Sequence, residues 1–436
     1  PFGMHAVGSP VLGFDNVKVV GTAASNAGLL GGAQKPDNAT ECFGLSDDDW
    51  VGIYKFGAND KKPNERTFWS GFRTGTNLVA RGELPGGPNV NLGTHPWQTD
   101  EGLVDLAAMV KEAMAVNDLF IFAAPWSPPG WMKTTGNFID GHFKDGCERA
   151  YANYLAAYVK ACRDRGIAVK AVTAQNESAL STRGTYPSCV FTAEQEAKLA
   201  RLLAAKLKAE SPDTAVWLWD WDYHGADGRL DGQLSKFGLA EVVGGIAWHS
   251  YSNGEEKMGA LKAKYPQIPF YHTEMGPAKH DPRRNEQWWA GKLGRAFENG
   301  CESFTGWNLC LDADGQPLVG PHLCMGLVTV DPETGDFTPS AQYNLFRHVA
   351  PFVKPGAAVL RAEGDRDGME LLLFRNPGGE YVLVAACSAG HGLTTRPRAW
   401  DNEPRPKLYV KCGGEYKHLP LPYGTWSVTT MVFKKK

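Results

Sequence analysis

The feature that most limits the fold of this chain is a repeated unit between residues 119 and 308, in which an apolar, β-prone run is followed by a helical pattern. Alternation of this kind predicts a parallel sheet whose strands are joined by helical crossovers. Because the runs are apolar along their whole length, we expect both faces of the sheet to be covered. The expected strands are 119–124, 168–174, 216–219, 245–248, 268–274 and 303–308.

Helix signals fall between the expected strands. Apolar residues from Tyr151 to Cys162 recur at helical spacing. Thr192 and Gln195 form a capping box that opens a helix through about residue 209, and Asn285 is placed to cap another. Further helical segments are expected near residues 106–113, 234–242 and 256–264.

Two more βα units in the first hundred residues would complete an eight-fold (β/α)8 TIM barrel. Val17–Val20 and Asn77–Ala80 are plausible strands in that region. The alternative is an open, doubly wound sheet. No GxGxxG motif follows a first strand, and polar residues recur at many strand ends. Open sheets concentrate their sites at one switch point, so this pattern favours the barrel.

After about residue 349 the helical period disappears. Short strands at 370–374, 381–386, 407–410 and 425–429 are separated by turns rich in Gly and Pro, which predicts a small all-β domain. The expected domains are an N-terminal segment 1–25 that packs on the β domain, a barrel domain 26–348 and the all-β side domain 349–436.

Charge and composition argue against several partners. The 436 residues carry a net charge of −3, which gives no reason to expect a nucleic acid or an anionic membrane. No apolar run approaches the roughly 18 residues that span a bilayer. The nine cysteines contain no CxxC pair, so buried free thiols are expected rather than a zinc site. No signal-peptide pattern is visible from Pro1 onwards, but a trimmed form would look the same, and we predict a secreted, extracellular protein.

Two of the expected strands lead into a carboxylate. Ala171–Thr173 runs on to Glu177, and Ile268–Thr273 runs on to Glu274. In a parallel sheet or barrel, the carboxyl ends of the strands are where sites are built. Two glutamates that face each other there form the carboxylate pair that cleaves a glycosidic bond. An ion-paired glutamate at a strand end is the alternative interpretation of each residue.

Six short motifs lie in order along the chain. They are APWSPPGWMKT at 124–134, QNE at 175–177, YPS at 186–188, WHSY at 248–251, HTE at 272–274 and GWNL at 306–309. Together they resemble glycoside hydrolase family 30, which contains glucosylceramidases, β-glucosidases, β-1,6-glucanases and xylanases. The end of the chain, from Val410 to Val432, is similar to the side β-domain of that family.

The resemblance implies a (β/α)8 barrel fused to a C-terminal β-sandwich. It also implies a retaining mechanism in which Glu177 is the acid/base and Glu274 is the nucleophile. Their carboxyl groups are then expected about 5–5.5 Å apart. No metal and no cofactor is expected, because His249 and His272 lack ligand spacing with any Cys or His. One departure is Ser178, which follows Glu177 where the family usually has Pro.

The candidate substrate-binding residues are Asn176, Trp126, His249, Tyr251 and Trp307. The resemblance implies that Asn176 binds the 2-OH of the sugar, while tryptophan rings suit the apolar faces of sugars. His249 and Tyr251 lie two residues apart, so they share a face and are expected to contact the nucleophile or the substrate. Core packing of the tryptophans and a satisfied core histidine are the alternatives.

Three further polar residues lie near the expected strand ends. Asp220 and Asp222 fit pocket residues and solvated loop charges equally well. His272 is expected to be structural.

The leading hypothesis is a retaining β-glycosidase that hydrolyses β-linked glucosyl or xylosyl substrates by double displacement, so the expected partner is a carbohydrate. The alternative is an endo-acting β-glycanase of the same family, either a β-1,6-glucanase or a xylanase. A carbohydrate-binding protein without catalysis would leave the paired carboxylates without a role. The sequence leaves the sugar, the linkage and the oligomeric state open.

Overall fold

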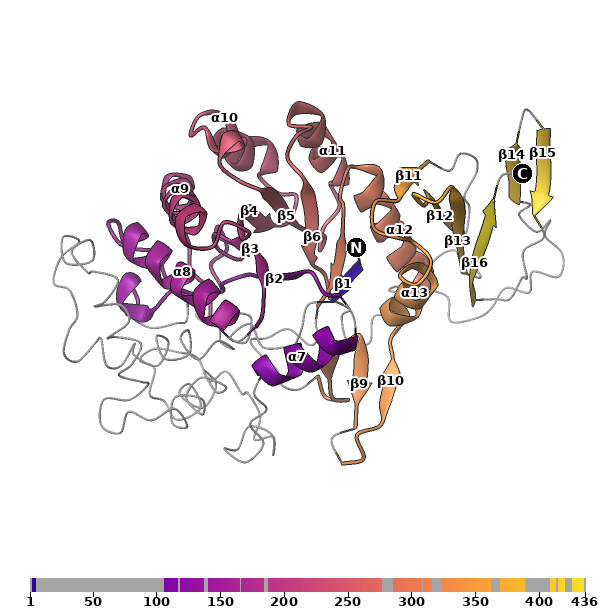
Figure 1. Ribbon diagram of the computed structural model, residues 1–436, viewed down its shortest axis with the longest axis horizontal. Helices are drawn as coiled ribbons and strands as arrows, with labels where there is room; N and C mark the ends of the chain where they lie inside the picture. The colour runs from indigo at the N-terminus through magenta and orange to yellow at the C-terminus, as the bar shows by residue number, and fades with distance from the viewer. Residues whose placement is uncertain are drawn as a thin grey trace.

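The computed structural model describes residues 2–4, 106–116, 118–136, 140–164, 166–183, 187–276, 285–307, 309–315, 324–331, 333–361, 369–388, 408–412, 415–419 and 426–434. Figure 1 shows a parallel sheet with helices along its outer side, and an antiparallel sheet beyond the last of those helices. The plausible strands at Val17–Val20 and Asn77–Ala80 lie outside the described residues.

The parallel sheet contains five strands in the order β2-β3-β4-β5-β6. A further strand, β7, runs beside β6, where the amide of His272 donates to the carbonyl of Ser303 at 3.3 Å. Each strand therefore lies next to its neighbour in sequence with no reversal of order, as in a barrel. The strands are β2 (Ile121–Ala123), β3 (Val169–Thr173), β4 (Ala215–Trp221), β5 (Gly245–His249), β6 (Phe270–Glu274) and β7 (Phe304–Gly306).

The helices between these strands follow the sequence signals closely. Thr192 forms the capping box with Gln195, and the Asn285 side chain accepts from the Trp288 amide. The expected helical segment near 234–242 is not continuous, because Gly238 adopts a left-handed φ of 63° between the short helix α10 and the 3-10 helix η5. The elements are α7 (Leu106–Val116), η3 (Gly130–Met132), α8 (Glu148–Asp164), α9 (Ala193–Glu210), η4 (Ala226–Leu230), α10 (Asp231–Ser235), η5 (Leu239–Glu241), α11 (Glu255–Lys264) and α12 (Glu286–Glu298).

Both faces of the parallel sheet are covered, as its apolar strands predict. One face packs on the helices in the main core, which includes Leu218 and Ile246. The other face forms a separate cluster around Trp217, whose ring stacks on Tyr271 with centroids 4.2 Å apart. The sheet therefore encloses an inner layer of side chains below the carboxyl ends of its strands.

After β7, strand β8 pairs in parallel with β9, which pairs antiparallel with β10. Strands β11 to β16 form antiparallel sheets, in agreement with the expected all-β character. A four-stranded sheet has the order β11-β12-β13-β16, and it lies beyond α12 and α13 in Figure 1. Phe374 of this sheet packs edge-on against Phe297 of α12, with centroids 5.8 Å apart. The elements are β8 (Cys310–Leu311), β9 (Val328–Val330), β10 (Phe337–Pro339), α13 (Ala341–Val349), β11 (Ala358–Leu360), β12 (Met369–Arg375), β13 (Glu380–Ser388), β14 (Leu408–Cys412), β15 (Glu415–Leu419) and β16 (Trp426–Lys434).

Strand β1 (Phe2–Met4) pairs in parallel with β7, so these three residues of the N-terminal segment join the barrel strands. The remainder of residues 1–25 lies outside the described part, and the domain bounds stay predictions. Four cysteines of the described part are buried, namely Cys147, Cys162, Cys189 and Cys301. Within the described ranges, no helix is both long and apolar enough to cross a membrane.

Candidate active site

Glu177 lies in a turn that follows β3. Its backbone takes a left-handed φ of 46°, which is uncommon for a residue other than glycine. The turn is held by backbone hydrogen bonds: the Glu177 amide donates to the carbonyl of Asp220 at 2.9 Å, and the Leu180 amide donates to the carbonyl of Glu177 at 2.8 Å. The side chain keeps 19% of its surface exposed. Glu177 is therefore fixed in position while its carboxylate stays accessible.

Glu274 is the last residue of β6, and it is buried. The Tyr251 hydroxyl donates to its Oε1 atom at 2.9 Å. Its Oε2 atom is buried and has no hydrogen-bond partner among the described residues. A buried carboxylate oxygen without a donor is costly, so this atom is available to a reacting group.

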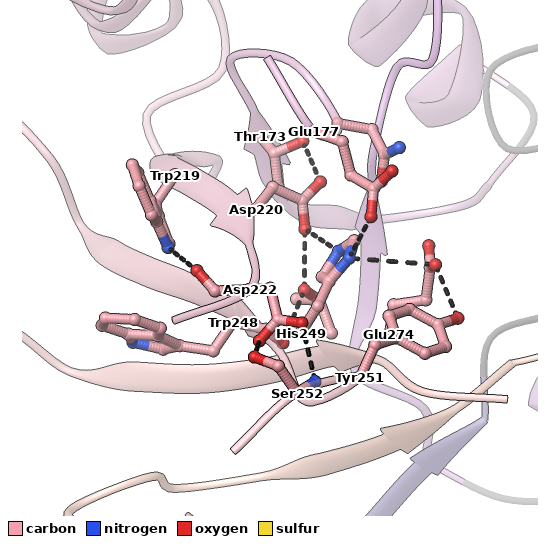
Figure 2. A network of polar contacts seen from close by, with 12 residues as sticks. Thr173, Glu177, Trp219, Asp220, Asp222, Trp248, His249, Tyr251, Ser252 and Glu274 are labelled. Carbon is pink, nitrogen blue, oxygen red and sulfur yellow. Dashed lines mark hydrogen bonds and ion pairs between the residues drawn. The ribbon is translucent and has the colours of Figure 1, made fainter. Parts of the chain in front are cut away.

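His249, the last residue of β5, lies between the two glutamates (Figure 2). Its Nδ1 atom is 3.1 Å from Oε1 of Glu177 and 3.8 Å from Oε1 of Glu274. One carboxylate oxygen of each glutamate and one ring nitrogen of His249 all lie within 4.8 Å of one another. The structure thus brings together three residues that are far apart in sequence.

Asp220 supports the other side of the His249 ring. Its Oδ1 atom is 3.2 Å from Nε2 of His249 and accepts a hydrogen bond from the Thr273 hydroxyl at 2.7 Å, while its Oδ2 atom accepts one from the Thr173 hydroxyl at 2.8 Å. Asp220 is fully buried, so a solvated loop charge, one of its two interpretations from sequence, is wrong.

The position of Asp220 depends on an irregularity in β4. The register of β4 against β5 shifts between Trp219 and Trp221, and both Trp219 and Asp220 have positive φ, 83° and 48°. A bulge of this kind re-aims the side chains that follow it. Sequence alternation alone cannot locate such a bulge.

The charges of this cluster depend on one another. Burial would lower the pKa of His249, but the carboxylate of Glu274 and the hydrogen bonds to Asp220 and Glu177 raise that pKa well above its usual value. Burial raises the pKa of Glu274 to about 7, the charges of Glu177 and Asp220 add to the rise, and the His249 charge opposes it. His249 is therefore an imidazolium held among carboxylates.

Tyr251 is placed by the loop that follows β5. The residue as a whole is 37% exposed, while its hydroxyl reaches Glu274. On one side of it, Ser250 hydrogen-bonds the Tyr223 hydroxyl at 2.7 Å. On the other side, the Ser252 amide and hydroxyl donate to the two carboxylate oxygens of Asp222 at 2.8 and 2.7 Å (Figure 2). Asp222 therefore fixes the Tyr251 loop.

The two candidate tryptophans lie together. The rings of Trp126 and Trp307 stack with centroids 6.0 Å apart and an angle of 28°. Glycine is required at position 276, because a Cβ there would lie 2.5 Å from the carbonyl oxygen of Trp307. Asn176 is buried, and its side-chain oxygen has no hydrogen-bond partner within the described residues. Trp126, Trp307 and Asn176 are all largely buried, so they combine a packed aromatic pair with a buried polar oxygen that lacks a partner among the described residues.

His272 is structural, as expected. Its ring stacks on Phe304 with centroids 3.8 Å apart and planes 5° apart, and its Nδ1 accepts from the Thr305 amide at 3.3 Å. Burial, followed by the charges of His249 and Lys292, lowers its pKa well below the usual value. His272 is therefore a neutral core histidine that orders β6 and β7.

The trio of Glu177, His249 and Glu274 also has the composition of a cation site. The spacing of Cys and His along the chain does not reveal this trio, because its members follow or end three different strands. The raised pKa of His249 argues against metal binding, because a protonated ring nitrogen has no free lone pair. The absence of a catalytic metal stays a prediction.

Comparison with known proteins agrees with this geometry. Residues 103–354 match the Glycosyl hydrolase family 30 TIM-barrel domain. The chain belongs to glycoside hydrolase family 30. The match covers the parallel sheet and the residues described around His249, which are Glu177, Asp220, Tyr251 and Glu274. The family resemblance of the short motifs is therefore confirmed.

Individual relatives fall within the same family. An endo-1,6-β-D-glucanase of Trichoderma harzianum is 28% identical over 339 residues, which are 71% of this chain and 65% of the relative. A second endo-1,6-β-D-glucanase, from Neurospora crassa, is 26% identical over 352 residues, 74% of this chain and 72% of the relative. The mouse lysosomal acid glucosylceramidase is 24% identical over 298 residues, 62% of this chain and 57% of the relative. The chain thus spans from just over half to about 70% of these relatives.

Solved structures share the fold. The structure of an endo-β1,6-glucanase superposes with a TM-score of 0.65 at 23% identity, covering 76% of this chain and 75% of its own. The crystal structure of SrfJ from Salmonella typhimurium superposes with a TM-score of 0.66 at 23% identity, covering 80% and 77%. The half-barrel of β2 to β7 therefore belongs to the TIM-barrel fold of this family.

Proposed function

We propose that the protein is a retaining β-glycosidase in which Glu177 is the acid/base and Glu274 is the nucleophile. The observation that carries this proposal is the separation of the two carboxylates, which have one oxygen each within 4.8 Å of the other. Retaining enzymes hold the two groups about 5–5.5 Å apart, whereas inverting enzymes need about 6.5–9.5 Å to admit a water molecule.

In the first step, an oxygen of Glu274 attacks the anomeric carbon, and Glu177 donates a proton to the oxygen of the leaving group. The glycosidic bond breaks, and a covalent glycosyl ester forms on Glu274. In the second step, Glu177 is a carboxylate and takes a proton from water. The water oxygen attacks the anomeric carbon, and Glu274 leaves as a carboxylate. Two inversions give net retention.

The neighbouring residues support both steps. Nδ1 of His249 contacts both glutamates, so a positive charge on its ring stabilises whichever of the two is the carboxylate in each step. Asp220 fixes the ring of His249 from the opposite side. The Tyr251 hydroxyl holds one oxygen of Glu274 and leaves Oε2 free for attack. These steps require no metal and no cofactor.

The substrate side of the proposal uses Trp126, Trp307 and Asn176. An aromatic surface suits the apolar face of a sugar ring. The unpaired oxygen of Asn176 can accept a hydrogen bond from a sugar hydroxyl beside the carboxylate pair. We propose β-linked glucosyl groups as the substrate, with xylosyl groups as the variant to be tested.

Endo-acting hydrolysis of β-1,6-glucan is the second candidate. It is favoured because three of the curated relatives are named endo-1,6-β-D-glucanases, at 26% to 28% identity. The catalytic residues and their chemistry are the same in both candidates. The two differ only in whether the site accepts a terminal sugar or the interior of a chain.

Architecture and location complete the proposal. We propose that the half-barrel of β2 to β7 belongs to a closed (β/α)8 barrel over residues 26–348. We also propose that the antiparallel sheet belongs to a β-sandwich over 349–436. Secretion remains a prediction, and one relative, the mouse enzyme, is named for the lysosome, another compartment outside the cytoplasm.

A substrate panel tests the proposed function. It contains nitrophenyl β-glucoside, β-xyloside and β-galactoside together with β-1,6-glucan, xylan and glucosylceramide. We expect release of β-anomeric product from a glucosyl substrate, followed by proton NMR during the first turnovers. Hydrolysis that yields the α-anomer, or equal activity in the Glu177→Gln/Glu274→Gln double variant, would overturn the assignment.

A further inference from the structure

The turn that carries Glu177 contains an unusual residue. Ser178 occupies the position where the family usually has Pro, and its side chain is buried, with 1% of its surface exposed. Proline would fix the backbone torsion φ at this position by its ring. Serine offers no such restraint, yet Glu177 beside it holds a left-handed backbone that must be supported by its surroundings.

The support comes from a buried polar network. The Ser178 hydroxyl donates to Oε2 of Glu196 at 2.8 Å and accepts from Nη2 of Arg229 at 3.1 Å. The same Glu196 oxygen accepts from Arg229 at 2.7 Å and from Gln233 at 2.9 Å. Glu196 is fully buried on α9, so Ser178 is tied to a charged centre on the helical layer.

The polar network and the backbone hydrogen bonds both hold the segment of Glu177 and Ser178. The Ser178 carbonyl accepts from the Phe191 amide at 2.7 Å, and the amide of Glu177 donates to Asp220 at 2.9 Å. Thus Ser178 is held at its side chain and at its carbonyl, immediately after the residue that reaches toward His249 at 3.1 Å. Charge-assisted hydrogen bonds such as those to Glu196 are the stronger kind.

We infer that Ser178, anchored on Glu196 and Arg229, is the positioning residue that aims Glu177. This inference rests on the proposed function, since it concerns how the acid/base is held. Loss of the Ser178 hydroxyl leaves Glu177 present but lets its turn relax. The protonated carboxyl then reaches the leaving-group oxygen less well, while the nucleophile is unaffected.

The test is the dependence of kcat/KM on the leaving group, for aryl β-glycosides of the sugar that the wild type cleaves. Because kcat/KM reports the glycosylation step, a poor leaving group such as phenol needs the acid and 2,4-dinitrophenol hardly does. We expect Ser178→Ala to lose about tenfold or more on the phenyl glycoside and less than about threefold on the dinitrophenyl glycoside. Glu196→Gln should show the same direction, and Ser178→Thr, which keeps the hydroxyl, should restore the wild-type ratio.

Ser181→Ala is the matched control. Ser181 lies in the same segment, but it is exposed and donates to Asp140, at 3.0 Å, outside the network. It should leave the ratio unchanged. Equal losses on both leaving groups in Ser178→Ala, accompanied by a lower melting temperature, would mean a purely structural role and overturn the inference.

Crystal structures of the wild type and Ser178→Ala give a second readout that does not depend on activity. We expect the contact between Glu177 and Nδ1 of His249, 3.1 Å in the wild type, to lengthen or break. An unchanged contact would overturn the inference. Failure of the wild type to cleave any member of the substrate panel would instead count against the proposed function, which separates the two outcomes.

Discussion

Replacement of His249 by glutamine removes the positive charge between the two glutamates while keeping a polar side chain of similar size. The Nδ1 atom lies 3.8 Å from Oε1 of Glu274, so two unit charges at that distance interact by about 4 kcal/mol at an effective dielectric constant of about 20. At about 1.36 kcal/mol per pKa unit, the upper limit of the effect is about three units. Glu177 and Asp220 share the same cation, so we expect a shift of about one to two units.

The sign follows from the role of Glu274. A positive neighbour favours the ionised carboxylate, and its removal raises the pKa of Glu274 above the value of about 7 in the wild type. The nucleophile must be ionised to attack. Activity in His249→Gln should therefore disappear at a higher pH than in the wild type as the solution is made more acidic, with a far larger loss near pH 6 than near pH 9.

The assay is the pH dependence of kcat/KM for a nitrophenyl β-glycoside, fitted for the acid limb. Tyr251→Phe is the control, because it removes a neutral hydrogen bond to the same carboxylate, and we expect an upward shift below about one unit. A lower maximal kcat/KM in either variant does not affect the test, because only the pH at which kcat/KM falls on the acid side is compared. An acid limb of His249→Gln that stays in place or moves to lower pH would refute the reasoning.

Three further predictions follow from the same site. Glu274→Gln should lose activity on all substrates, whereas Glu177→Gln should still release a burst of nitrophenol. Azide should rescue Glu177→Gln and give a β-glycosyl azide. An α-glycosyl azide from Glu274→Gln, with no rescue of Glu177→Gln, would reverse the two roles. Chelators such as EDTA should leave kcat unchanged, and a loss that a divalent ion restores would show that the carboxylate pair holds a metal. Gly276→Ala should place a Cβ 2.5 Å from the Trp307 carbonyl oxygen and lower the free energy of unfolding by about 1–3 kcal/mol, measured by urea denaturation, with Gly378→Ala, where a Cβ meets nothing within 4 Å, as the control.

The central half of the fold was predictable because its signals are local. Each strand from β2 to β7 is a short apolar run. The helix caps at Thr192 and Asn285 can be identified from residues within three positions of each cap. The meeting of Glu177 and Glu274 was also predictable, because parallel strands bring their carboxyl ends to one edge. The strand positions and the direction of the chain are enough to place both glutamates at that edge.

The remainder of the site depends on geometry that sequence patterns do not carry. Asp220 enters the site through a bulge with two left-handed residues, and nothing in the alternation of β4 marks it. The tie from Ser178 to Glu196 joins residues 18 positions apart through a helix face. A single signal was available in advance, namely the replacement of the family's proline by a serine.

Helix α12 has a consequence for what a domain means in this chain. Leu293 on this helix and Leu372 on β12 belong to one continuous core cluster, which also includes Ile246 of the parallel sheet. The expected domain boundary at residue 349 therefore separates two parts of the sequence that share one hydrophobic core. Cutting the chain there would strip the cover from a helix that is apolar on two sides, so the two parts should melt as one cooperative unit rather than in succession.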